Sequence, residues 1–163
     1  MIQVTDYQSV ISLAPIWKLS RKTGHMENNK DIKIFLVDDD PFCLSLYEGH
    51  LRNLGYHDIT KFDNGFSCLD ALNQKPDIIF IDQTMDGLTG IDVLKRVKYK
   101  DPDIYTVFVS GIEDIRTAIN SIKNGAFDFI IKNNEVLKKM EKVMNEIITI
   151  QLTLKKRPQE IYF

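Results

Sequence analysis

The sequence contains few of the residues and segments that mark several large classes of protein. It has two cysteines, Cys43 and Cys68, far apart and without histidines at ligand spacing, so neither a disulfide framework nor a zinc site is indicated. The 21 basic and 23 acidic side chains give a net charge of −2, without the basic excess of a nucleic-acid-binding protein. The longest apolar stretch near the start, residues 10–19, is interrupted by Ser12 and Pro15 and is too short to span a bilayer. We therefore expect a cytoplasmic protein with reduced thiols and with no nucleic-acid or membrane partner.

The pattern of apolar and polar residues divides the 163 residues into three segments. Residues 1–30 lack sustained periodicity, and we interpret them as an N-terminal leader of unknown role. Residues 31–154 carry regular apolar runs and are predicted to form one domain, which is long enough to bury a core without disulfides. Residues 155–163 form a short basic tail, which we expect to be solvated rather than to contact DNA.

The leader has three competing interpretations. In the first it is a docking segment, in which Ile16, Trp17 and Leu19 pack on another surface. In the second it is sequence upstream of a true start at Met26. In the third it is a remnant of cloning, because the text Gly-His-Met that ends at Met26 resembles one.

Within the predicted domain, short apolar runs alternate with amphipathic helical patterns. The run Ile34–Val37 is typical of a strand buried on both faces, and Asp40 and Pro41 are predicted to begin the helix that follows it. The predicted strands are residues 34–37, 59–62, 78–81, 105–109 and 127–131, and the helical patterns run through residues 44–54, 64–72, 91–97, 115–122 and 135–154. This alternation predicts a three-layer α/β/α domain with a five-stranded parallel sheet.

Four of the five predicted strands end at polar residues that a phosphate site would use. Asp38 and Asp39 follow the first strand, Asp82 follows the third, Ser110 follows the fourth and Lys132 follows the fifth. Each residue alone is also explained as an ordinary turn residue. Because the carboxyl ends of parallel strands share one edge of the sheet, we expect the whole set to lie together there.

Three carboxylates at one edge favour a bound cation, because like charges this close oppose simultaneous ionisation. All-oxygen ligands suit Mg²⁺, which takes one or two carboxylates and keeps several waters. We predict that Asp38, Asp39 and Asp82 bind Mg²⁺ and that the backbone carbonyl of Thr84 completes its coordination. Three aspartates, Lys132 and Mg²⁺ sum to zero formal charge, a state ready to accept an anion.

The same set predicts phosphoryl transfer onto a carboxylate. Asp82 stands alone at the centre of the sheet and is the candidate nucleophile. Catalysis of such a transfer is mostly positioning and stabilisation of charge on the phosphoryl oxygens. Lys132 is predicted to pair with one oxygen as a compact cation, and the hydroxyl of Ser110 is predicted to donate to another.

Four blocks of sequence carry a resemblance to a known family. They are residues 34–41, residues 77–82 with Met85 and Gly90, residues 109–111, and residues 124–132. In this order and spacing, residues 32 to about 152 resemble the receiver domain of two-component response regulators, in its stand-alone, chemotaxis-type form. The resemblance covers about three quarters of the chain and implies a flavodoxin-like fold with strand order 2-1-3-4-5.

The resemblance also implies roles for the site residues. Asp82 is then the phosphoacceptor, Asp38 and Asp39 the acid pair, Ser110 the switch hydroxyl and Lys132 the family's lysine. Phe129 is then the aromatic switch. The alternative interpretation of Phe129, a core aromatic on a mostly apolar strand, stands beside this one.

Two positions depart from the family pattern. Asp86 and Asn133 stand where the family usually has proline. A cis bond before Asn133 would cost about 2.5 to 4 kcal/mol, so we expect a trans bond and a differently shaped loop after the fifth strand. We expect the carboxylate of Asp86 to face solvent rather than the metal.

The main prediction is a cytoplasmic receiver that takes a phosphoryl group from a histidine kinase or phosphotransfer protein onto Asp82, with Mg²⁺, and is not a turnover enzyme. It would signal to a downstream protein through the side formed by its fourth helix, fifth strand and fifth helix. Ile150 and Leu152, near the end of the last helix, are candidates for a homodimer or partner face.

Two alternatives come from other classes. The first is an enzyme resembling haloacid-dehalogenase phosphatases, which needs its nucleophile on the first strand and a second acid two residues later, whereas this sequence has Thr84 in that place. The second is a binding module that works without phosphorylation, which full partner binding by an Asp82→Ala variant would favour.

Overall fold

The computed structural model describes residues 31–111 and 115–156. The predicted leader and the end of the predicted tail lie outside the described residues. The strands are β1 Ile34–Val37, β2 Ile59–Phe62, β3 Ile78–Ile81, β4 Tyr105–Ser110 and β5 Asp128–Ile131. The helices are α3 Pro41–Asn53, α4 Gly65–Asp70, the 3-10 helix η2 Ala71–Gln74, α5 Gly90–Lys100, α6 Ile115–Lys123 and α7 Val136–Lys156. The predicted alternation of strands and helices is therefore confirmed.

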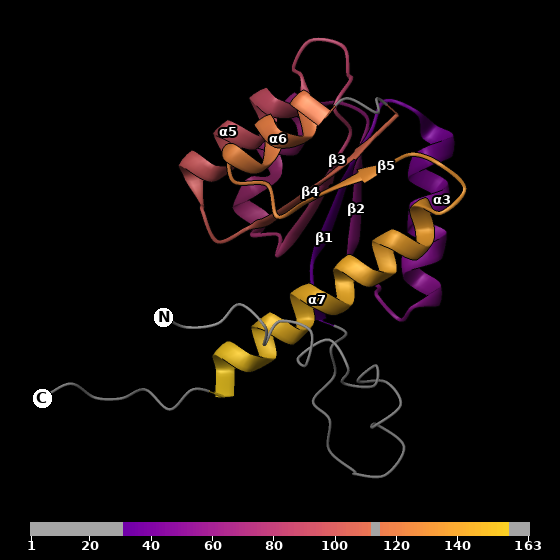
Figure 1. Cartoon of the computed structure of the whole chain (residues 1–163), viewed down its shortest axis with the longest axis vertical. Helices are drawn as coiled ribbons and strands as arrows, with labels where there is room; N and C mark the ends of the chain where they lie inside the picture. The colour runs from indigo at the N-terminus through magenta and orange to yellow at the C-terminus, as the bar shows by residue number, and fades with distance from the viewer. Residues whose placement is uncertain (1–30, 112–114, 157–163) are drawn as a thin grey trace, which may run out of the picture.

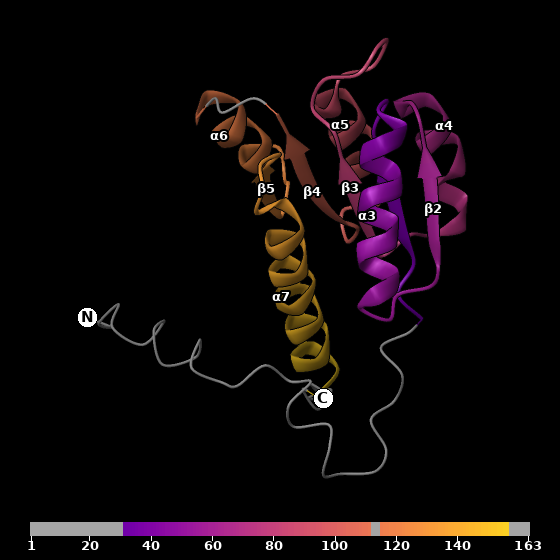
Figure 2. The same ribbon diagram turned by 90° about the vertical axis from the view of Figure 1, so that its right-hand side faces the viewer.

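The five strands form one parallel sheet in the order β2-β1-β3-β4-β5, as the resemblance implied. All strands point toward the same edge (Figure 2). The central strands β1 and β3 are buried along their whole length, because helices cover both faces of the sheet. Their register pairs Val37 with Ile81, so the residues that follow these two strands emerge side by side.

The sheet separates two helical layers (Figure 1). Helices α3 and α7 pack on one face, where their apolar side chains form the larger core cluster with alternate residues of β1 and β3. Helices α4 and α5 pack on the other face with the remaining residues of these strands. The three-layer prediction is thus confirmed. The two core clusters lie on opposite faces of the central strands β1 and β3.

Local capping explains where several helices begin. The side chain of Asp40 accepts from the backbone N–H of Phe42, and Pro41 is in the first turn of α3, as predicted. Helix α5 begins with a capping box, in which Thr89 and Asp92 each accept from the other's backbone N–H. This fixes the first turn of α5 next to the end of β3.

Helices α6 and α7 differ in how they use their apolar residues. The stripe on α7 is buried, with Met140, Met144 and Ile147 at 0% exposure. The apolar residues predicted for one face of α6 are instead largely exposed, with Ile115 at 76% and Ile119 at 49%. Within residues 31–111 and 115–156, no helix has the length and hydropathy that a membrane crossing requires.

Candidate functional site

The acid cluster at the end of β1 and β3 follows from the register of these strands. The backbone N–H of Asp82 donates to the carbonyl oxygen of Val37 at 2.8 Å, which continues the ladder beyond the last paired residues. Asp38 and Asp82 are buried, at 2% and 5% exposure, and Asp39 is exposed. One carboxylate oxygen from each of the three aspartates lies within 4.8 Å of the others. The predicted acid cluster is therefore assembled as the sequence indicated.

Lys132 joins two of these carboxylates. Its Nζ lies 2.7 Å from Oδ2 of Asp38 and 3.1 Å from Oδ1 of Asp82. The remaining oxygen of Asp38 accepts from the backbone N–H of Asp40 at 2.9 Å, and that of Asp82 accepts from the N–H of Thr84 at 3.2 Å. Both buried carboxylates are therefore held through both oxygens. We call Asp38, Asp39, Asp82 and Lys132 the acid edge.

The pairing of β4 with β5 places Lys132. Ser110 is opposite Ile131 in the register, and the backbone N–H of Lys132 donates to the carbonyl oxygen of Ser110 at 2.8 Å. Ser110 is fully buried and is the last residue of β4, where the sequence predicted it just after that strand. The strand ends therefore bring Ser110 to the same edge as the lysine.

The charged groups of the acid edge shift one another's pKa values. Burial, together with the neighbouring carboxylates Asp38 and Asp39, raises the pKa of Asp82 even though Lys132 acts in the opposite direction. Burial alone would lower the pKa of Lys132, but its hydrogen bonds to Asp38 and Asp82 outweigh this and raise it. Three carboxylates and one ammonium leave a formal charge of −2 at this edge.

The donor set fits a hard divalent cation. Its ligand atoms are oxygens, they converge within a few ångströms, and the exposed carboxylate of Asp39 leaves the cluster open on one side. Thr84 is exposed at the start of the loop after β3, next to Asp82. This chemistry agrees with the Mg²⁺ prediction.

Gly90 and Tyr47 shape the site, although the sequence did not predict either of them as a site residue. A Cβ atom on Gly90 would lie 2.5 Å from the backbone oxygen of Asp82 and 2.8 Å from the ring of Phe108, so only glycine lets α5 begin this close to β3. Tyr47 of α3 is buried beside Asp38 and Asp82, where burial strongly raises the pKa of its hydroxyl. In the sequence, Tyr47 falls within the helical pattern of residues 44–54, which did not indicate a place at the site.

Phe129 lies between the two interpretations given to it. Its side chain is half-buried, and its ring stacks on Phe108 of β4 with centroids 6.3 Å apart and an interplanar angle of 14°. It packs at the margin of a small cluster with Ile91, Leu94 and Ala126. This ring is therefore a partly buried core contact.

The two departures from the family pattern have visible consequences. Asp86 is exposed and is not one of the three clustered aspartates. The peptide bonds of the described segments are all trans, including the bond between Lys132 and Asn133, as expected. The side chain of Asn133 accepts from the N–H of Glu135 at 3.0 Å and leads the chain into α7.

Comparison with known proteins decides the family. The sequence profile of the response regulator receiver domain matches residues 34–145. The chain belongs to this family. The luminescence regulatory protein LuxO of Vibrio campbellii is 32% identical to this receiver over 122 residues, which are 68% of this chain and 27% of LuxO. Chemotaxis protein CheY of Listeria monocytogenes is 28% identical over 115 residues, which are 68% of this chain and 97% of CheY.

Solved structures agree with the sequence relatives. The response regulator domain of Thermotoga maritima CheB superposes with a TM-score of 0.64 at 25% identity and covers 72% of this receiver and 96% of that domain. A receiver domain from Clostridium thermocellum reaches a TM-score of 0.69 at 23% identity, over 76% of this chain and 98% of that one, and supports the fold. The receiver spans about a quarter of the length of LuxO.

Membership in the receiver family is consistent with a phosphoacceptor function in a two-component system. The phosphatase alternative gains no support, because Asp82 follows the third strand and Thr84 replaces the second acid that such enzymes need. The acid edge is therefore the candidate site of phosphorylation.

Proposed function

We propose that Asp82 accepts a phosphoryl group from the phosphohistidine of a histidine kinase or phosphotransfer protein. The observation that carries this proposal is the bridging position of Lys132, whose Nζ contacts both Asp38 and Asp82 at the end of the sheet. This arrangement supports a receiving carboxylate with a cation already beside it. Asp39 and Thr84 are exposed, so a donor would approach from their side.

The transfer exchanges one bond to phosphorus for another. A carboxylate oxygen of Asp82 attacks the phosphorus while the bond from phosphorus to the donor imidazole nitrogen breaks, and its electron pair stays on that nitrogen. Lys132 would meet one of the phosphoryl oxygens and the hydroxyl of Ser110 would donate to another, where negative charge must be stabilised. The product is an acyl phosphate on this chain, and in this proposal the domain is the substrate of the transfer rather than a turnover enzyme.

Mg²⁺ would be held by Asp38, Asp39, Asp82 and the backbone carbonyl of Thr84. When bound, the ion supplies positive charge that offsets the carboxylates and the transferring group. The fit rests on the oxygen-only donor set and on the formal charge of −2 that the described side chains leave uncompensated.

The signal would leave through the side formed by α6, β5 and α7. Ser110 at the end of β4 and the half-buried Phe129 on β5 are the proposed switch pair, and phosphorylation would shift the population of their side-chain positions. The exposed isoleucines of α6 supply an apolar surface for a downstream protein or for a second receiver. Such a signalling domain would act in the cytoplasm.

Intact mass after incubation with a small acyl phosphate tests the proposal. We expect one added phosphoryl group on the parent in the presence of Mg²⁺, and none on Asp82→Asn or when the metal is chelated. Asp86→Asn is the matched control, because it changes an exposed carboxylate in the loop after β3. An adduct that persists in Asp82→Asn, or its absence from the parent with every donor, would refute the assignment.

A further inference from the structure

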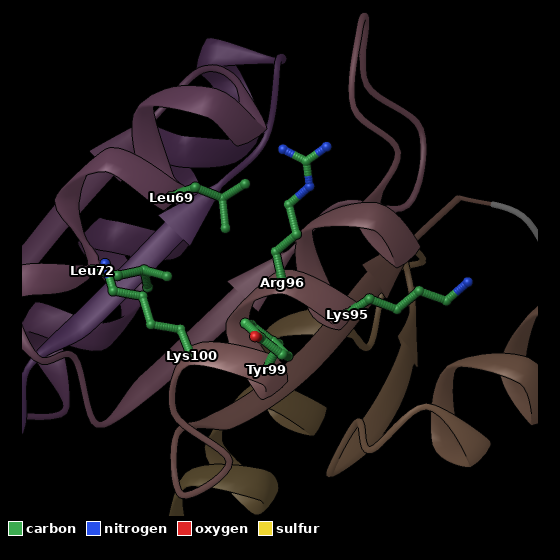
Figure 3. A pocket seen from close by; sticks show the side chains of 6 residues that line it. All are labelled: Leu69, Leu72, Lys95, Arg96, Tyr99 and Lys100. Atoms are coloured by element: carbon green, nitrogen blue, oxygen red, sulfur yellow. The ribbon is translucent and has the colours of Figure 1, made fainter.

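A groove separates α5 from the α4–η2 segment, on the face of the sheet opposite α3 and α7. Its volume is about 440 Å³, and it is lined by Leu69, Leu72, Lys95, Arg96, Tyr99 and Lys100. We call these six residues the basic groove (Figure 3). The acid edge uses none of these residues.

The floor of the basic groove is apolar. Leu69 and Leu72 line it from the α4–η2 side, and Tyr99 of α5 lies at its margin (Figure 3). Tyr99 is 94% exposed, the highest value among the large apolar and aromatic side chains of the described residues. An aromatic ring this exposed contributes nothing to the core, so its contact area is available to a partner.

The rim of the basic groove is cationic. Arg96 extends beside Leu69, and Lys100 reaches toward Leu72, while Lys95 extends on the far side of Tyr99 (Figure 3). Within the described part of the chain, no carboxylate lies within 4.0 Å of any of these three cations. Their charge is therefore not offset by a close ion pair.

The positive charge of α5 is concentrated at the basic groove. The whole chain has a net charge of −2, yet the last two turns of α5 carry four basic residues, while the acids of this segment, Asp92 and Asp101, lie in its first turn and at its C-cap. One of the basic residues, Lys98, is turned away, since its Nζ donates to the carbonyl oxygens of Pro102 and Ile104. The other three are those that line the groove.

We propose that the basic groove docks an acidic amphipathic helix of a partner protein. A ridge of apolar side chains on such a helix would fill the groove between the two helical segments, as ridges fill grooves in helix packing. Glutamates or aspartates beside that ridge would meet Arg96, Lys100 and Lys95. The half-buried Leu69 adds apolar surface beside the cations, which an apolar side chain of a peptide would cover better than a nucleic-acid phosphate.

This docking site goes beyond phosphorylation and lies apart from the surface proposed for output. Helix α5 begins at Gly90 beside the acid edge, and Tyr99 lies nine residues later, about 13 Å along the helix. The groove is on the α4–α5 side, whereas the proposed output side is formed by α6, β5 and α7. Loss of one activity can therefore be told from loss of the other.

Fluorescence anisotropy with a synthetic probe tests the proposal on the full chain. The probe is a fluorescein-labelled helical peptide of about 18 residues, with leucines on one face and glutamates on both flanks. A second probe carries glutamine in place of every glutamate. We expect the acidic probe to bind at micromolar concentration, more weakly as salt is added, and the glutamine probe to bind at least about tenfold more weakly.

Paired charge reversals locate the site. We expect Arg96→Glu with Lys100→Glu to weaken binding of the acidic probe at least about tenfold, since unlike charges become like charges. The matched control reverses two exposed cations of α7, Lys138→Glu with Lys142→Glu, and should stay within about twofold. Tyr99→Ser, at an exposed position, should also weaken binding and leave the thermal unfolding temperature unchanged.

Several outcomes would overturn the proposal. Equal loss in the α7 control, equal binding of the glutamine probe, or no binding of the acidic probe below millimolar concentration would each do so. Tighter binding to single-stranded DNA or to phosphatidylserine vesicles, removed by the groove variants, would assign the surface to those ligands instead. Self-association that the groove variants abolish would assign it to a second copy of this chain. In each case the mass test of Asp82 is independent.

Discussion

The acid edge and the basic groove both gather charged side chains, but they hold them in opposite ways. At the acid edge, Lys132 reaches across the sheet to carboxylates from two other strand ends, and Asp38 and Asp82 are almost fully buried. In the basic groove, the cations come from a single helix and are exposed at its surface, and among the described residues no carboxylate lies within 4.0 Å of them.

This difference in burial and pairing determines what each group of charges acts on. Buried, cross-linked charges set the protonation state and the chemistry of the groups they touch, because their removal leaves partners uncompensated. Exposed charges on one helix add little to stability and act mainly on molecules that approach from outside. The following substitutions test this contrast, beginning with the largest expected effect.

The same substitution in the two regions should differ most in phosphorylation. We expect Lys132→Met to lower the rate of phosphorylation by a small acyl phosphate at least about 100-fold, because the cation beside Asp82 is lost. Lys100→Met, in the basic groove, should leave that rate unchanged. Intact mass followed over time measures both. Equal rates for Lys132→Met and the parent would show that the bridging ammonium has no part in the transfer.

Helix α5 contributes to the basic groove and begins beside the acid edge. Its first residue, Gly90, packs against the backbone of Asp82. We expect Gly90→Ala to lower the free energy of unfolding by about 1–3 kcal/mol, because its Cβ would overlap the backbone at Asp82. Gly49→Ala is the control, since Gly49 lies inside α3 with open space around it and alanine there should stabilise by about 0.5–1 kcal/mol. Urea unfolding measures both; a neutral Gly90→Ala would contradict the close approach.

The acid edge should also reveal itself through the pH dependence of stability. The pKa of Asp82 is raised in the folded protein, mainly because the carboxyl group is buried. Its contribution to stability is therefore fully present below the unfolded pKa and is lost as the pH rises through the folded pKa. At neutral pH without Mg²⁺, the ionised carboxylate therefore destabilises the folded protein, and asparagine removes this effect. We expect Asp82→Asn to raise the unfolding temperature at pH 7 by a few degrees.

Two further measurements sharpen this prediction. The advantage of Asp82→Asn should shrink as the pH is lowered, because the parent carboxylate then becomes protonated. Added Mg²⁺ should stabilise the parent more than the variant, since the variant lacks one proposed ligand. Asp86→Asn should follow the parent in both experiments, because this side chain is exposed and stands outside the cluster. A stabilisation of Asp86→Asn equal to that of Asp82→Asn would point to net charge as the cause.

The sheet and the acid edge were predictable from sequence because both follow from strand periodicity. Continuous apolar runs predicted the buried strands, and a parallel sheet then had to bring Asp38, Asp82 and Lys132 to one edge. The strand order came from the resemblance, because alternation of strands and helices alone fits more than one order. The trans bond before Asn133 followed from the loss of proline.

Other features depend on tertiary geometry that no local pattern encodes. The apolar residues of α6 have helical spacing, yet Ile115 and Ile119 are exposed, since periodicity shows that a face exists but not that anything covers it. The close approach of Gly90 depends on how α5 docks against β3. The basic groove needs Leu69 and Arg96 side by side from two different helical segments, so the charges of α5 alone did not indicate it.

The smallest expected effect concerns two lysines of α5. Lys98 has hydrogen-bond partners within the fold, whereas Lys100 is an exposed residue of the basic groove. Lys98 is half-buried, its Nζ donates to two backbone carbonyls after the helix, and burial lowers its pKa. Lys98→Met would leave those carbonyls without this donor, and we expect a loss of about 1 kcal/mol in the free energy of unfolding. Lys100→Met should change it by less than about 0.5 kcal/mol, because an exposed cation without a close partner contributes little to folding. Urea unfolding of the two variants decides this. A loss for Lys100→Met as large as that for Lys98→Met would mean that the cations of the basic groove stabilise the fold, and their place at the surface would then need no partner to explain it.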